Sequence, residues 1–116
     1  MSRPSRPSSV SATIRYASLA LALVALGGCN ELSARRAVQE GNAEYGEQNY
    51  DKAAAHFEKA IAKAPDLEIA HHNLGITYSR MFKPGVDTPE NKALADKAAV
   101  QLTWWLAKHP DDTKIR

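Results

Sequence analysis

The stretch from Tyr50 to Ala64 constrains the fold more than any other feature of this 116-residue chain. Its apolar residues are separated by steps of three and four: Tyr50, Ala53, Ala54, Phe57, Ala60, Ile61 and Ala64. This spacing places them on one face of a helix. Pro65 and Asp66 end that helix, and the same period resumes between Leu67 and Met81. The pattern therefore predicts two successive helices, each of which must bury one face.

One further helix is predicted on either side of this pair. The segment 34–45 can form a shorter helix that ends near Gly46, and Pro89 to Lys108 a longer one. Thr88 before Pro89 is typical of a helix cap followed by a first-turn proline. No strand pattern is present in the sequence. We therefore expect an all-α fold of antiparallel helix–turn–helix units.

Individual positions within residues 34–66 narrow this expectation. Gly41 and Ala53 are small enough to let helix backbones approach closely, and Phe57 can fill the space between the helices. When Ala34 is counted as the first position, several residues match those of the tetratricopeptide repeat, a helix–turn–helix unit of about 34 residues. The matching residues are Gly41, Tyr50, Ala53, Phe57, Ala60 and Pro65. The segment resembles this repeat, although Ala37 and Glu40 replace the usual Trp and Leu.

A second, irregular unit comes after the first. It begins at Glu68, and Leu74, Gly75 and Tyr78 fall on its seventh, eighth and eleventh positions. An insertion of about eleven residues relative to the repeat period then separates its helices. Trp105 stands where a small residue is expected. We predict repeat 1 at about 34–67 and repeat 2 at about 68–112, with a loop at 83–88. The last residues resemble the opening of a third repeat.

The N-terminal residues differ in composition from the helical part. Residues 1–13 are rich in Ser, Pro and Arg and have no apolar period, so we expect them to be disordered. An apolar run extends from Tyr16 to Leu26, too short to span a hydrocarbon core, which takes about 20 residues. Such a run after several arginines is typical of a signal peptide.

The apolar run ends in Leu26-Gly27-Gly28-Cys29. These four residues resemble the lipobox of bacterial lipoproteins. The resemblance implies that residues 1–28 are a signal peptide removed by cleavage, that lipid is attached to Cys29, and that 29–33 are the lipidated terminus and a linker. Two or three acyl chains would give stable anchoring. The alternative is an ordinary signal peptide whose cleavage site contains a cysteine. By resemblance to enterobacterial sorting rules, Asn30 leaves the outer membrane open as the destination.

Charge and cysteine content exclude several classes of protein. The chain has 15 Lys and Arg against 13 Asp and Glu, and three of the arginines precede residue 29. Cleavage there leaves a net charge of about −1, which argues against a nucleic-acid binder with a basic face. The single Cys excludes an intrachain disulfide framework and a zinc site with several cysteines.

No catalytic or metal-binding motif is present in the sequence. It contains neither H-E-x-x-H nor C-x-x-C-H, and no glycine-rich phosphate loop. The histidines are interpreted as solvated helix residues: His56, His71, His72 and His109. We therefore expect no enzymatic activity, no metal and no cofactor.

A protein-binding groove is the better hypothesis. In tetratricopeptide proteins the first helices of successive repeats line a concave surface that takes an extended peptide or a helix. By this resemblance the residues facing it would be Arg35, Asn42, Tyr45, His72, Asn73 and Arg80. Asn42 and Asn73 match the asparagines of the subfamily that binds a C-terminal carboxylate, but Val38 replaces its first Lys.

Trp104 and Trp105 form a second candidate contact patch. They would lie beside an apolar face with nothing over it, and such a face needs a cover on a small domain. A partner, a second copy of the chain or the rest of a longer protein would supply that cover. The remaining alternative is that the two repeats are marginally stable.

These features lead to competing hypotheses for function. The first is a lipid-anchored adaptor on the periplasmic side of a bacterial envelope, which binds an unidentified envelope protein or peptide, in envelope assembly or secretion, and no nucleic acid. The second is an accessory subunit or N-terminal module of an envelope enzyme complex. The third is a structural lipoprotein that self-associates into a homo-oligomer through Trp104 and Trp105.

Overall fold

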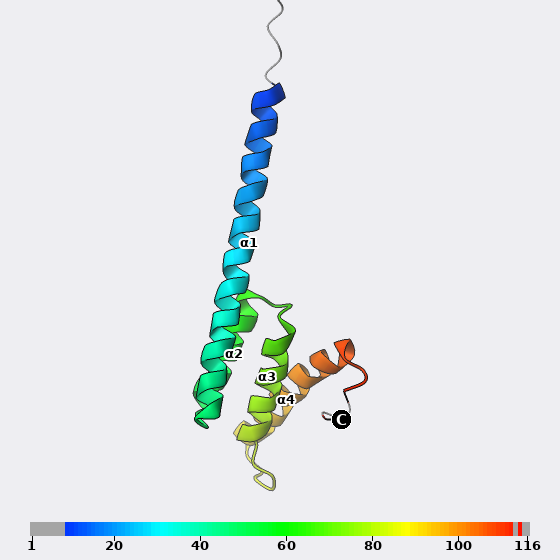
Figure 1. The fold of residues 1–116 in the computed structure, drawn as a ribbon. Coiled ribbons are helices and arrows are strands. Elements are labelled where there is room, and N and C mark those ends of the chain that lie inside the picture. The colour runs from blue at the N-terminus through cyan, green and yellow to red at the C-terminus, as the bar shows by residue number, and fades with distance from the viewer. Residues whose placement is uncertain (1–8, 113, 115–116) are drawn as a thin grey trace, which may run out of the picture.

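The computed structural model describes residues 9–112 and 114, with side chains from residue 27 onward. The described residues form four helices and no strand: α1 (Ser9–Gly46), α2 (Tyr50–Lys63), α3 (Glu68–Met81) and α4 (Pro89–Lys108) (Figure 1). The all-α prediction is confirmed. The predicted bounds of the last three helices agree with the structure to within one residue at each end.

Helix α1 is longer than predicted. It is one continuous helix of 38 residues, and its N-terminal half projects beyond the other three helices (Figure 1). The expectation of disorder is therefore wrong for residues 9–13, whereas residues 1–8 lie outside the described part. Residues 29–33, interpreted above as a terminus and linker, also belong to α1. Ala and Leu dominate residues 17–26, and extending an existing helix costs far less than starting one.

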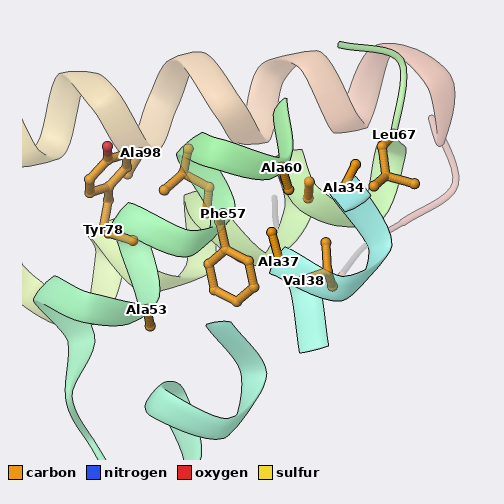
Figure 2. Close-up of a cluster of buried hydrophobic side chains, with 12 residues drawn as sticks. Ala34, Ala37, Val38, Ala53, Phe57, Ala60, Leu67, Tyr78 and Ala98 are labelled. Carbon is orange, nitrogen blue, oxygen red and sulfur yellow. The ribbon is translucent and has the colours of Figure 1, made fainter. Parts of the chain in front are cut away.

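Two helical pairs build the rest of the fold. The C-terminal half of α1 packs against α2, α3 packs against α4, and α2 joins the pairs through α3. The buried apolar cluster contains Ala34, Ala37, Val38, Ala53, Ala54, Phe57, Ala60, Leu67, Ala70, Leu74, Tyr78 and Ala98. Figure 2 shows the Phe57 ring directed into this cluster. No helix among the described residues has the length and hydropathy needed to cross a membrane.

A glycine marks the crossing point in each pair. A Cβ built on Gly41 would lie 2.6 Å from Cε1 of Phe57, and one built on Gly75 would lie 2.6 Å from Cδ2 of Leu102. Real Cβ atoms do not come so close, and packed interiors leave no spare room. The glycines therefore let the large side chains of α2 and α4 lie directly against the backbones of α1 and α3.

The connection between α1 and α2 is short. The backbone N–H of Gln48 donates to Tyr45 O at 3.0 Å, and that of Asn49 donates to Glu44 O at 2.9 Å. This is the bond pattern of a Schellman ending. Gln48 has a φ of +64°, in the left-handed region where glycine is favoured. The sharp turn into α2 therefore carries a strained residue.

The connection between α3 and α4 is the predicted insertion, and it spans residues 82–88. Gly85, with a φ of +81°, comes after Pro84, and the N–H of Val86 donates to Lys83 O at 3.2 Å. These are the marks of a type II turn. The predicted cap at Thr88 is confirmed, because its Oγ1 accepts from the N–H of Asn91 at 3.2 Å.

The side chain of Asn91 holds this loop in place. It is 5% exposed. Its Nδ2 donates to Lys83 O at 2.7 Å and to Val86 O at 2.8 Å, and its Oδ1 accepts from Lys83 N at 2.8 Å. One buried amide thus satisfies three backbone groups that the inserted loop leaves without a helical partner.

Candidate functional site

A small groove lies between the first helices of the two pairs, α1 and α3. Its pocket has a volume of about 240 Å³ and is lined by Asn42, Tyr45, Phe57, His72, Asn73 and Ile76. Phe57 reaches the pocket from α2, between α1 and α3. The pocket therefore combines an apolar base with polar side chains from two helices, a composition common at ligand sites.

Two asparagines join α1 to α3 across this groove. Asn73 Nδ2 donates to Asn42 Oδ1 at 2.8 Å. Nδ1 of His72 lies 3.2 Å from Asn73 Oδ1, so the imidazole extends the same polar row. Carboxamides both donate and accept hydrogen bonds, as the peptide backbone does. This row can therefore bind the main chain of an extended segment.

A second bond links the two helices at the other end of the groove. Arg80 Nε donates to the Tyr45 hydroxyl oxygen at 3.2 Å. The Tyr45 ring meets that of Tyr50 edge to face, with centroids 5.2 Å apart. The bond with Tyr45 raises the pKa of Arg80 above its ordinary value. Arg80 is exposed, and its cation is available to a partner's acidic or aromatic group.

Arg35 is not brought to the groove. Its Nη2 lies 2.9 Å from Glu31 Oε1, one turn earlier on α1, and both side chains are exposed. The structure thus groups five of the six predicted groove residues: Asn42, Tyr45, His72, Asn73 and Arg80. Arg35 instead forms a surface ion pair within its own helix.

A larger pocket, not anticipated from the sequence, lies beside the inserted loop. Its volume is about 690 Å³, and it is lined by Gln48, Asn49, Tyr50, Asp51, Lys52, Arg80, Met81, Lys83, Val86, Thr88, Glu90, Asn91 and Leu94. Its charged groups are of both signs. Arg80 borders this pocket and also bonds to Tyr45 of the groove. The insertion is visible in the sequence, but the cavity depends on how the loop folds back.

The two tryptophans lie against histidine rings. Trp104 stacks on His71 with centroids 3.8 Å apart. Trp105 stacks on His109 at 3.7 Å and meets His72 of the groove at 4.6 Å. Both tryptophans are half-buried. The predicted contact patch is therefore partly covered by the chain's own side chains.

The residues after α4 turn back onto this cluster. Trp105 Nε1 donates to Asp112 Oδ2 at 2.9 Å, and His109 Nε2 lies 2.7 Å from Glu68 Oε2. The bond from the indole lowers the pKa of Asp112, with smaller contributions from the Lys114 backbone and from His72. The turn is thereby held against the N-terminal part of α3.

His71 differs from the prediction of a solvated histidine. It is 7% exposed, and both of its ring nitrogens have partners. Nε2 lies 2.7 Å from Pro65 O, and Nδ1 lies 2.7 Å from Gln101 Oε1. A carbonyl oxygen only accepts, so Nε2 carries a hydrogen. The prediction is wrong for this residue because α4 crosses α3 at this point. No group of three or more possible metal-ligating side chains occurs among the described residues.

Comparison with known families agrees with this arrangement. The model of the TPR repeat matches residues 41–81, from Gly41 in α1 to the end of α3. No curated protein and no solved structure matches the chain. The match covers α2 and segments of both helices that border the groove. The resemblance to the tetratricopeptide repeat is thus confirmed for residues 41–81.

Proposed function

We propose that this chain is a lipid-anchored adaptor that holds an extended segment of another envelope protein in the groove between α1 and α3. Repeats of this type act through protein–protein interaction. The observation that carries the proposal is the pair of bonds across the groove, Asn73 to Asn42 and Arg80 to Tyr45, on either side of an apolar pocket. These bonds fix the spacing of α1 and α3 before a partner arrives, which reduces the entropy cost of binding.

The anchor is the second part of the proposal. Cys29 comes after the signal-like run and is exposed on α1. Attachment of acyl chains to its sulfur and to the new amino group would fix the chain at a bacterial membrane on the periplasmic side, with the outer membrane as a candidate. The groove begins at Asn42, only a few helical turns from the attachment point.

Site-specific crosslinking in living cells tests the groove. A photoreactive residue is placed in the full chain at Ile76, which lines the pocket, and separately at the exposed Ala55 of α2. We expect one envelope protein to be captured from position 76 and not from position 55. Y45A and R80A should each reduce the capture at least fivefold, and R36A, at an exposed site on α1, should not. Equal capture from both positions would contradict the groove.

The anchor is tested separately by mass spectrometry of the membrane-bound protein. We expect a mature chain that begins at Cys29 and carries the added mass of its acyl chains. The Cys29→Ser variant should lose this mass and leave the membrane fraction. A mature chain with an unmodified thiol would overturn the anchor and leave the groove unaffected.

A further inference from the structure

We propose that the indole N–H of Trp105 and the imidazole of His72 form a carboxylate-binding site, and that an acidic side chain of the partner takes it over from Asp112. This inference rests on the proposed function, because it names the chemistry of the partner that the groove receives. The chain's own carboxylate now occupies the site.

The site offers one oriented hydrogen-bond donor beside an imidazole ring. Trp105 Nε1 can only donate, and it points at Asp112 Oδ2 at 2.9 Å. The His72 ring lies against the indole, with centroids 4.6 Å apart. The site also favours the ionised carboxylate, because the pKa of Asp112 is lowered by the indole and, to a smaller extent, by His72.

The site is continuous with the groove. His72 lines the pocket together with Asn42 and Asn73, while its ring also contacts Trp105. A peptide whose backbone lies on the asparagine row would therefore bring its next side chains to the indole. A carboxylate there would find a hydrogen-bond donor already oriented, a neutral amide would accept the same bond more weakly, and an apolar side chain would leave the donor unpaired.

The present occupant is held by few contacts. Among residues 9–112 and 114, the other oxygen of Asp112, Oδ1, accepts only from the backbone N–H of Lys114 at 3.2 Å. The side chain of Asp112 makes no ion pair among those that the described residues form. A carboxylate carried by a segment that also fills the groove can therefore displace it.

The test uses the signal of the Trp105 indole N–H in the full chain in detergent, assigned with Trp105→Phe. The probe is the peptide acetyl-Gly-Asp-Gly-amide, and the control probe has Asn in place of Asp. In Asp112→Ala we expect the indole signal to lose its hydrogen-bond shift and to regain it saturably with the Asp peptide. The Asn peptide should bind at least tenfold more weakly.

Asp111→Ala is the matched control, because it removes the same charge from the neighbouring exposed residue. It should respond to the Asp peptide as the unmodified chain does, at least tenfold more weakly than Asp112→Ala. Adding His72→Phe to Asp112→Ala should weaken the binding at least threefold. Asp112→Asn, which keeps an uncharged acceptor and the local turn, should give an intermediate response if Asp112→Ala does not fold.

The inference is overturned if neither Asp112 variant responds to the Asp peptide, or if both probes act equally. Asp112 would then serve only the turn that it forms with Lys114. Capture of a partner from position 76 in cells would be unaffected by that result. Loss of that capture together with a positive peptide response would instead overturn the adaptor and keep the carboxylate site.

Discussion

The two helical pairs cross in the same way and differ in the side chains at the end of their second helix. In each pair a glycine of the first helix receives a large side chain of the second, Phe57 on Gly41 and Leu102 on Gly75. The turns after α2 and α4 are also alike: Leu67 N–H donates to Ala64 O at 3.0 Å, and Asp112 N–H to His109 O at 3.1 Å. The backbone thus repeats even where the side chains do not.

The side chains at these two ends are of opposite kinds. Ala60 is fully buried, and Leu67 is 8% exposed, so the first pair ends in an apolar contact with the second. The positions that correspond to them in the second pair hold Trp105 and Asp112, which bond to each other and remain half-buried. One backbone thus supports either an apolar contact between repeats or a polar cluster.

Truncating the large side chain at each crossing should give the largest difference in stability between the two pairs. Phe57 is 1% exposed, so Phe57→Ala should lower the free energy of unfolding by about 3–5 kcal/mol. Leu102 is half-buried, so Leu102→Ala should cost about 2 kcal/mol. Urea unfolding followed by circular dichroism measures both. Equal losses would mean that the two crossings are packed equally well.

Removal of the Asn91 side chain should destabilise the inserted loop at residues 82–88, which connects the helices of the second pair. Asn91→Ala leaves the backbone groups of Lys83 and Val86 without their partner and should cost about 2 kcal/mol, because one substitution removes three hydrogen bonds. Lys92→Ala, next to it, removes only an exposed ion pair with Asp87 of the loop and should cost less than about 0.5 kcal/mol. The same unfolding experiment measures both, and amide hydrogen exchange should show faster exchange in residues 82–88 of Asn91→Ala alone.

Adding a methyl group at each glycine tests how tightly each crossing is packed. Gly41→Ala pushes against the Phe57 ring, which is 1% exposed, and we expect a loss of about 1–2 kcal/mol. Gly75→Ala meets Leu102 Cγ at 2.7 Å and Gln101 Cβ at 3.2 Å, so part of α4 must shift, although Leu102 is only half-buried. Alanine favours the helix by up to about 1 kcal/mol at both positions. We therefore expect a loss at Gly75 that is smaller than the loss at Gly41. A larger loss at Gly75 than at Gly41 in thermal unfolding would reverse our ranking of the two crossings.

A glycine should relieve the strained turn of the first pair. Gln48→Gly relieves a left-handed backbone conformation and should raise the free energy of unfolding by about 1 kcal/mol. Gln48→Ala keeps the strain and should leave stability nearly unchanged. A glycine variant no more stable than the alanine variant would show that the turn holds Gln48 without cost.

The polar cluster of the second pair should respond to acid. Because the pKa of Asp112 is lowered in the folded chain, its contribution to stability is present above its unfolded value of about 3.9 and is lost as the pH falls through the folded value. The Trp105 indole signal should therefore titrate with a midpoint below about 3.9. Removing the donor with Trp105→Phe should raise the pKa of Asp112 towards its ordinary value, as the carboxyl carbon signal would report.

The sequence is sufficient for the features that depend on local spacing. The bounds of α2, α3 and α4 follow from apolar periods, Pro65 and the Thr88-Pro89 cap, and the glycine crossings follow from two positions in one repeat pattern. That Asn42 and Asn73 face each other could be predicted for the same reason, since each lies at a fixed position of its unit.

The features that were missed depend on how distant helices meet. His71 is buried because Pro65 O and Gln101 close over it. The neighbouring His72 is also a histidine, but it lies in a different environment. Asn91 resembles an ordinary first-turn residue until the inserted loop folds over it. The continuous α1 was missed because Gly27 and Gly28 were interpreted only as part of a cleavage site.

The unbroken α1 sets how far a partner can be from the bilayer. If the chain is anchored at Cys29 as we propose, Ala34 lies five residues, or about 7.5 Å, along the helix axis from the attachment point. Asn42 and Tyr45 lie at most about 20–24 Å from it. A rigid join of this length confines the groove to a thin layer above the lipid headgroups. The partner must present its segment within that layer, where diffusion in two dimensions raises the effective concentration of both.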